Sequence, residues 1–249
     1  MATKARTTPA PQLHRDGLKL PTHVGIIMDG NSRWAARLNL PRLAGHEAGV
    51  RNVRRTLETL VQRGVKYVTI YAFSTENWNR PTEEVQGIMA LLEHVIQAET
   101  QGLHQQGVRI LHLGRTDRLS SSLRQAVTQA QEMTRGNTRA TLCVAFDYGG
   151  RVEILEAVRR LLAQGIAPAE LDEELFSRNL YTAGLPDPDL IVRTGGELRL
   201  SNFLLWQSAY SEYYATRTLW PDFDDAEIAK ALEAYGHRQR RFGARNHEG

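Results

Sequence analysis

An apolar run that ends abruptly in an acid and a turn is the feature that most constrains how this chain folds. Residues 24–28 (VGIIM) have the character of a buried strand and lead directly into Asp29. In an open α/β sheet, ligands lie outside the carboxyl ends of the strands, where the next helix presents unpaired N–H groups. Asp29 is therefore a candidate ligand of a divalent cation, although capping of the next helix is the structural alternative. The residues after it are candidates for binding an anion: Gly30, Asn31, Ser32 and Arg33.

Strand-like and helix-like segments alternate along the rest of the chain. After Asp29 we expect a polar connection as far as His46. Apolar runs bounded by turn residues predict strands over residues 65–73, 108–113, 140–146 and 189–193. Apolar positions at helical spacing predict helices over residues 50–61, 82–106, 120–133, 152–162, 168–180 and 225–241. This order predicts an α/β fold with a mainly parallel central sheet flanked by helices.

No repeat, low-complexity core segment or interior linker interrupts this pattern, so we expect a single domain. Its predicted bounds are residues 21–243, between a loose tail, 1–20, and a flexible end, 244–249. The tail lacks the apolar run of a secretory signal, and no run approaches the roughly 18 apolar residues that span a membrane. Cys143 is the single cysteine and lies in a predicted buried strand. We expect a cytoplasmic protein with at most a peripheral membrane contact.

The charge composition bears on the partners. With 31 basic and 28 acidic residues the formal net charge is only +3, which does not require nucleic acid as a partner. Four of the 31 basic residues are lysines, so 27 are arginines. Arginine binds phosphate in a bidentate manner more readily than lysine does, although genomic base composition explains such a bias equally well.

A second strand-like run, residues 65–73, also ends in a polar cluster. Because strand-end loops bring distant residues to one crevice, the cluster is a candidate part of the same site. Ser74, Glu76 and Asn77 could bind substrate or relay protons. Trp78 offers a flat apolar face, and Arg80 offers another anion contact. An ordinary strand-to-helix loop is the alternative.

The third cluster follows the run at residues 189–193. Arg193, Arg199 and Ser201 surround a glycine pair that permits close approach of the backbone, which predicts a second anion site. Glu212 follows among tyrosines, where an acid is costly unless it is paired or bound to a metal. It is a candidate second metal ligand beside Asp29, with a half-exposed strand glutamate as the alternative.

Six colinear motifs resemble the cis-prenyltransferase family, most closely the bacterial undecaprenyl diphosphate synthases. They are HVGIIMDGNSRWA (23–35), PRLAGH (41–46), YAFSTENWNRP (71–81), DYGGR (147–151), DLIVRTGGELRLSNFLLWQ (189–207) and YSEYY with LWPDF (210–223). The resemblance implies that family's α/β fold, a homodimer and Mg²⁺-dependent condensation of isopentenyl diphosphate onto an allylic diphosphate such as farnesyl diphosphate, with cis double bonds. The implied product is a long polyprenyl diphosphate, the precursor of the undecaprenyl lipid carrier of cell-wall peptidoglycan synthesis.

The resemblance also implies roles for individual residues. Asp29 would be the catalytic acid that coordinates Mg²⁺ and helps the allylic diphosphate leave, and Asn77 would assist proton removal by orienting water or a phosphate oxygen. Implied substrate-binding residues near Asp29 are Gly30, Asn31, Ser32, Arg33, Trp34, Arg42 and His46. Others line the substrate site: Ser74, Thr75, Glu76, Trp78 and Arg80. Isopentenyl diphosphate would be bound by Arg193, Arg199, Leu200 and Ser201. Glu212 would join the metal from the other subunit, and Arg241 with Gly243 would reach the partner's active site.

The growing chain would need an apolar tunnel. Candidates on the helix at 82–106 and the strand at 140–146 are Val85, Ile88, Met89, Leu92, Val95, Ala140, Leu142 and Val144, although a helix packed in the core shows the same stripe. Ala140 is small enough to form the tunnel floor. Two positions depart from the family pattern, because Ser32 stands where many relatives have Gly and Asp147 where Asn is common.

Other functions fit the sequence less well. A phosphohydrolase with Asp29 as nucleophile would have a second aspartate two positions later, where Asn31 stands. A trans-type prenyltransferase would have paired aspartate-rich motifs. A non-catalytic accessory subunit is disfavoured because Asp29, Arg193 and Glu212 are all retained, and an RNA-binding module is disfavoured by the near-neutral charge.

Overall fold

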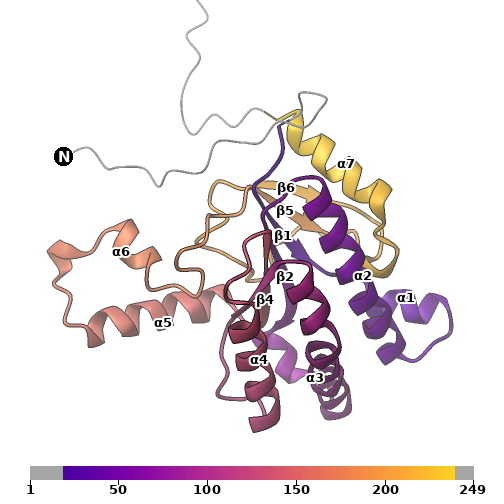
Figure 1. Cartoon of the computed structure of the whole chain (residues 1–249), viewed down its shortest axis with the longest axis horizontal. Helices are drawn as coiled ribbons and strands as arrows, with labels where there is room; N and C mark the ends of the chain where they lie inside the picture. Colours follow the sequence, from indigo (N-terminus) through magenta and orange to yellow (C-terminus); the bar gives the residue numbers. More distant parts are fainter. Residues whose placement is uncertain (1–18, 239–249) are drawn as a thin grey trace, which may run out of the picture.

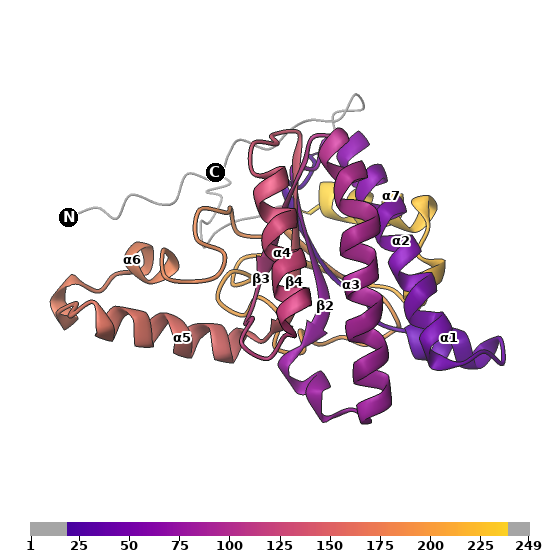
Figure 2. The same cartoon turned by 60° about the horizontal axis from the view of Figure 1, so that its bottom comes forward.

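A computed structural model describes residues 19–238 of the chain. Within this range six strands form one sheet in the order β3-β4-β2-β1-β5-β6, and every neighbouring pair is parallel. Figure 1 labels these strands except β3, which is labelled in Figure 2. The strands are β1 (His23–Ile27), β2 (Tyr67–Ser74), β3 (Val108–Leu113), β4 (Ala140–Tyr148), β5 (Leu190–Arg193) and β6 (Glu212–Ala215). The predicted α/β class with a parallel sheet is therefore confirmed.

Helices cover one face of this sheet in a continuous layer. Contacts connect α7 to α2, α2 to α3 and α3 to α4, and Figure 2 shows these helices side by side. The helices are α1 (Asn31–Arg37), α2 (Arg42–Gln62), α3 (Thr82–Gln105), α4 (Ser121–Thr134), α5 (Gly150–Ala163), α6 (Glu173–Ser177) and α7 (Asp225–Gly236). Three short 3-10 helices are η1 (Thr75–Asn79), η2 (Pro168–Glu170) and η3 (Trp220–Asp222). Among the described residues, no helix is long and apolar enough to cross a bilayer.

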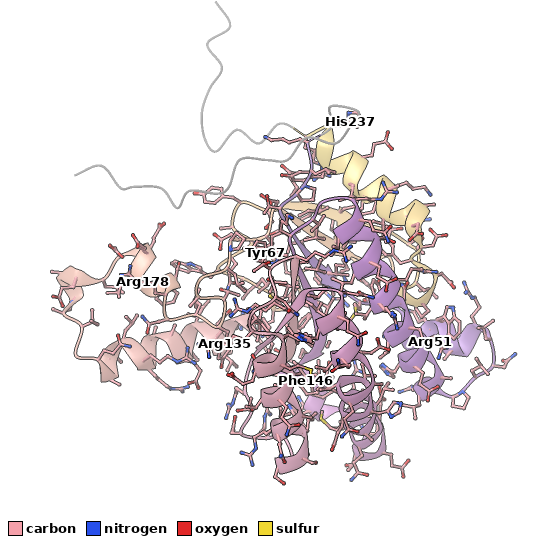
Figure 3. All side chains as sticks on the ribbon, viewed as in Figure 1. Arg51, Tyr67, Arg135, Phe146, Arg178 and His237 are labelled. Atoms are coloured by element: carbon pink, nitrogen blue, oxygen red, sulfur yellow. The ribbon has the colours of Figure 1, made fainter. Side chains whose placement is uncertain are left out.

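Strand β4 shows how the sheet separates two cores. Because side chains alternate along a strand, Leu142 packs with the core under α2 and α7, whereas Cys143 and Ala145 pack on the other face. Phe146, labelled in Figure 3, lies on the helical side between α3 and α4. Burial raises the pKa of the Cys143 thiol to about 12, as expected for a thiol in the core.

Two predicted segments differ from the structure. The polar connection after Asp29 is helical, because Gly30 begins α1 at φ 111° and Pro41 precedes α2. Its arginines Arg33, Arg37 and Arg42 are exposed, whereas Asn31 and His46 are partly buried, so the polarity marks one exposed helical face and not an irregular loop. The single helix predicted over residues 168–180 is instead the short η2 followed by the short α6. The Asp172 side chain accepts a hydrogen bond from the Leu175 amide at 2.7 Å and so caps the start of α6.

Most of the remaining predicted elements agree with the structure to within a few residues. The helix predicted over 50–61 is the exception, because α2 already begins at Arg42, and β6 was not predicted as a strand. The end predicted for the last helix, residue 241, lies beyond the described residues, where α7 has ended at Gly236. Ser32 lies inside α1 with no positive φ, so this departure from the family pattern causes no backbone strain. Helices α5 and α6 project from the body of the molecule (Figures 1 and 2). Residues 1–18 of the predicted tail, the predicted end 244–249, and Arg241 and Gly243 lie outside the described residues, whereas Leu20 is buried in the core.

Candidate active site

The parallel sheet gathers all three predicted clusters at one edge. Asp29 follows the end of β1, η1 follows the end of β2, and the Gly-rich turn follows Arg193 at the end of β5. Register places Ile27 beside Arg193, so Asp29 and the β5 turn are neighbours although more than 160 residues separate them. We call this edge the carboxyl rim.

Asp29 is held between two arginines at the carboxyl rim. Its Oδ1 accepts a hydrogen bond from Arg33 at 3.0 Å, and its Oδ2 accepts one from Arg193 at 2.8 Å. The Thr194 hydroxyl accepts from the Asp29 amide at 2.9 Å and donates to its carbonyl at 2.7 Å. The capping alternative is wrong, since Gly30 is the N-cap of α1 and makes no side-chain cap bond.

The charge state of Asp29 follows from these contacts. Burial alone would raise its pKa, but the hydrogen bonds and charges of Arg193 and Arg33 outweigh burial and lower the pKa below its ordinary value. Asp29 is therefore an anion that both neighbouring cations stabilise. A diphosphate arriving at either arginine would compete with Asp29 for the same donors.

Arg193 is the best-anchored cation of the rim. Its side chain is only 7% exposed, and its NH1 donates to the Arg199 carbonyl at 2.6 Å and to the Ser201 hydroxyl at 2.7 Å. Its Nε is buried without a hydrogen-bond partner. Arg199 is 59% exposed and pairs with Glu197 at 2.6 Å. The buried Arg193 and the exposed Arg199 together suit capture of an anion at this turn. Leu200 packs against the core below them.

A glycine turn lets Arg33 reach this cluster. Arg33 NH1 donates to the Gly195 carbonyl at 2.7 Å. Gly195 has φ 85°, and a Cβ there would lie 2.5 Å from Arg33 NH2. Only glycine provides both the left-handed backbone and this close approach.

Glu84 connects three predicted anion-binding residues and was not predicted as a site residue. Its carboxylate lies 3.0 Å from Arg80, 3.2 Å from Arg42 and 3.7 Å from His46 Nε2. Burial, with the nearby Arg80 charge, lowers the pKa of His46. The sequence shows Glu84 only as an acid in the first turn of α3, where the helix dipole explains it.

The turn η1 is closed by a capping box. The Ser74 amide donates to Asn77 Oδ1 at 3.0 Å, so the acceptor atom of Asn77 is already engaged. Glu76 accepts a hydrogen bond from Asn202 at 2.8 Å, and although burial acts the other way, hydrogen bonds lower the pKa of Glu76. Thr75 lies beside Gly149. Trp34, by contrast, turns toward η3 and donates to Asp222 at 2.8 Å.

An apolar cavity of ≈ 230 Å³ begins beside this rim. Asn31 and His46 line it near Asp29, and the Oδ1 atom of Asn31 is buried without a partner. Farther from the rim its walls are apolar: Val50, Val53 and Leu57 of α2, Ile88, Leu92, Val95 and Leu103 of α3, and Ile70, Ile110, Leu142, Val144 and Phe146 of the sheet. Arg51, labelled on α2 in Figure 3, lies at its solvent edge.

The cavity includes most of the predicted tunnel residues, namely Ile88, Leu92, Val95, Leu142 and Val144. Val85 and Met89 do not line it and pack in the core between α3 and α4. Ala140 does not line it either. It lies on the same face of β4 as Leu142 and pairs with Val108, one alternation farther from the rim.

Glu212 is not part of this cluster within one chain. It pairs with Leu190 at the start of β5, at the opposite end of the strand from Arg193, and accepts a hydrogen bond from Arg238 at 2.7 Å. In residues 19–238 no group of three or more His, Cys, Asp or Glu side chains is placed to hold a metal ion. Asp29 is the acid that lies between the two arginines of the described rim, Arg33 and Arg193.

This chain is similar in sequence and in fold to known proteins. A family model described as "Putative undecaprenyl diphosphate synthase" matches residues 27–243. The isoprenyl transferase of Heliobacterium mobile is 51% identical over 92% of this chain and 89% of its own length, and that of Aquifex aeolicus is 49% identical over 91% and 97%.

Two crystal structures are similar throughout. The lavandulyl diphosphate synthase of Lavandula x intermedia, in complex with dimethylallyl diphosphate, has a TM-score of 0.87 and 37% identity over 90% of this chain and 99% of that one. A probable undecaprenyl diphosphate synthase from Campylobacter jejuni has a TM-score of 0.76 and 31% identity over the same shares. The chain therefore belongs to the undecaprenyl diphosphate synthase family and is a cis-prenyltransferase.

Proposed function

We propose that this enzyme condenses isopentenyl diphosphate with an allylic diphosphate such as farnesyl diphosphate and repeats the step to give a long polyprenyl diphosphate. The observation that carries the proposal is the apolar cavity that begins at Asn31 and His46, directly beside the Asp29 cluster. One end of a prenyl diphosphate is strongly anionic and the other is apolar. The arginines beside Asp29 suit the anionic end, and the adjoining cavity suits the apolar end.

The allylic diphosphate is assigned to the side of the rim at Gly30, Asn31, Ser32, Arg33, Arg42 and His46, and isopentenyl diphosphate to Arg193, Arg199 and Ser201. Two diphosphates placed side by side repel each other, and the fixed cations Arg33 and Arg193 offset that repulsion. As the allylic C–O bond breaks, charge grows on the departing diphosphate, so these donors stabilise the transition state more than the bound substrate.

The proton lost in each step leaves C2 of the isopentenyl unit. Asn77 Oδ1 already accepts the Ser74 amide, which leaves the amide N–H₂ group of Asn77 to donate. We assign Asn77 the role of orienting a phosphate oxygen, which takes the proton, and Trp78, Thr75 and Arg80 the role of lining the site.

The donor set at Asp29 fits magnesium. Mg²⁺ is usually bound through one or two carboxylates, with substrate phosphates and water completing the octahedron, and Asp29 is a single, ionised carboxylate at the diphosphate site. When bound, Mg²⁺ would neutralise charge on the departing diphosphate. Arg33 and Arg193 would move their hydrogen bonds from Asp29 to the phosphate oxygens.

A homodimer is the proposed assembly. Leu155, Val158 and Leu162 form an exposed apolar stripe on α5, the helix that projects from the body (Figure 1), and a second copy would cover it. In such a dimer Glu212, distant from Asp29 in its own chain, is available to the partner's metal, and Arg241 with Gly243 to the partner's site. The proposed location is the cytoplasm, with peripheral membrane contact when the undecaprenyl product leaves for peptidoglycan synthesis.

The test is incubation with radiolabelled isopentenyl diphosphate, farnesyl diphosphate and Mg²⁺, followed by sizing of the products. We expect a long polyprenyl product, and Asp29→Ala should remove nearly all turnover with the fold intact by circular dichroism. Release of phosphate without any labelled lipid would support the phosphohydrolase alternative, and an inactive protein that activates a second synthase would support the accessory subunit.

A further inference from the structure

A buried carboxylate lies directly behind the substrate-lining turn η1. Asp147, near the end of β4, is fully buried and has φ 49°, a left-handed backbone that non-glycine residues rarely adopt. An ionised acid in such a place is costly unless it is paired and hydrogen-bonded. Its partners therefore indicate what the residue does.

Both carboxylate oxygens of Asp147 are engaged by two side chains. Trp78 Nε1 donates to Oδ1 at 2.8 Å. Arg118, in the turn between β3 and α4, donates from Nε to Oδ2 at 3.0 Å and from NH2 to Oδ1. The guanidinium carbon of Arg118 also lies 4.9 Å from the centre of the Trp78 ring. Asp147 and Arg118 thus hold the same indole by its edge and by its face.

The rest of the indole is fixed from the sheet side. Phe73 meets the Trp78 ring edge-on, with the ring centres 5.3 Å apart. No residue of η1 is fully buried, and Trp78 is the residue of this turn that packs, partly buried, against the core between α3 and α4. Toward the rim the turn makes polar contacts, among them the hydrogen bond between Glu76 and Asn202. The contacts of Trp78 therefore anchor η1 to β2, to β4 and to the turn before α4.

We propose that Asp147 and Arg118 are positioning residues that hold Trp78, and through it the substrate-lining turn η1, in the geometry that the condensation requires. This inference rests on the proposed function, because it assigns η1 to the substrate site. Neither residue contacts the rim cluster around Asp29, so both act through Trp78. Displacing reacting groups by about 1 Å can cost on the order of 10²-fold in rate.

The test compares two aspartate-to-alanine variants. Asp147→Ala removes both oxygens that accept hydrogen bonds from Arg118 and Trp78, whereas asparagine, common at this position in the family, would keep an acceptor. Asp117→Ala is the matched control, because Asp117 also pairs with an arginine, Arg115, but is 57% exposed and contacts no part of η1. The measurements are hydrogen exchange of the peptide covering residues 74–80, and kcat and KM for isopentenyl diphosphate.

We expect Asp147→Ala to speed exchange in that peptide and to lower kcat by about tenfold or more, with the control at the wild-type level. Arg118→Gln should do the same, and it serves as the second variant because the Arg118 side chain is 37% exposed and its loss leaves the core intact. Arg118→Lys should not restore kcat, since lysine keeps the charge but loses the planar fork and the stacking on Trp78.

The exchange measurement separates this inference from the proposed function, because it does not depend on activity. Unchanged exchange over residues 74–80 in both variants would overturn the inference, whatever the reaction proves to be. Wild-type kcat in both variants, or full activity of Arg118→Lys, would overturn it as well, because charge neutralisation alone would then be sufficient.

Discussion

Replacing Arg193 by lysine should damage both the fold and the reaction. The guanidinium makes hydrogen bonds in two directions, to Asp29 from NH2 and to the Arg199 carbonyl and Ser201 from NH1. A lysine ammonium is a single point on a straight stem and cannot occupy both nitrogen positions. At least one side of this network would lose its donor in a position that is only 7% exposed.

The size of the effect follows from those contacts. A lost hydrogen bond contributes about 1 kcal/mol, and one to a charged group about 1.5–3 kcal/mol, so the free energy of unfolding should fall by roughly 2–3 kcal/mol. For a chain of this size each kcal/mol shifts Tm by about 2–4 °C, which gives a drop of roughly 5–10 °C. Losing a preorganised donor to growing negative charge should lower kcat/KM for isopentenyl diphosphate by about 10²–10³-fold.

The assays are thermal unfolding and incorporation of labelled isopentenyl diphosphate. Arg178→Lys is the matched control, because Arg178 is 58% exposed and pairs only with Glu174 on α6, so both quantities should stay at wild-type values. If Arg193→Lys matched this control in Tm and in kcat/KM, the assignment of Arg193 as a buried, rigid anion ligand would be refuted.

Three further predictions concern the acid limit of stability, the product length and the C-terminus. Burial lowers the pKa of His23 from 6.5 to about 4, so between these pH values the unfolded chain binds more protons than the folded chain, and acidification from pH 6.5 to 4 should lower the free energy of unfolding by about 3 kcal/mol. Denaturant titrations at several pH values should show this dependence. If His23→Gln showed the same pH dependence, His23 would not be its origin. Ala140→Trp should shorten the products, because the ring would project from the face of β4 that carries Leu142 into the far end of the cavity; an unchanged chain-length distribution on thin-layer plates would exclude this. Deleting the last nine residues, from Arg241 on, should impair catalysis while circular dichroism stays unchanged, and full activity of the truncated protein would contradict the role given to Arg241 and Gly243.

The elements that the sequence predicted well are those with a strong periodic signal. β3 and α3 have continuous apolar patterns, and a proline or glycine marks where each segment starts or stops. α1 was missed because its short run places Ala35 alone in the core and exposes polar residues elsewhere. Seven residues with one buried position give too little periodicity for a helix to be distinguished from a loop.

The candidate site was predictable where chemistry and strand ends coincide. Asp29 and Arg193 each terminate an apolar run, and a parallel sheet necessarily brings such positions to one edge. Glu84, Asp147 and Arg118 could not be found in this way. Each of them acts through a partner far away in the sequence: Arg118 and Asp147 are 29 residues apart, Trp78 and Asp147 are 69 apart, and Arg42 and Glu84 are 42 apart. No local sequence pattern predicts such pairs.

A crystal structure with a non-cleavable thio analogue of farnesyl diphosphate, isopentenyl diphosphate and Mg²⁺ tests the central claim most directly. We expect the two diphosphates side by side on the carboxyl rim, one against Arg33 and Asp29 and the other against Arg193, with the farnesyl chain entering the cavity toward Leu142. Diphosphates bound away from Asp29, or a farnesyl chain lying outside the cavity between the sheet and helices α2 and α3, would contradict it.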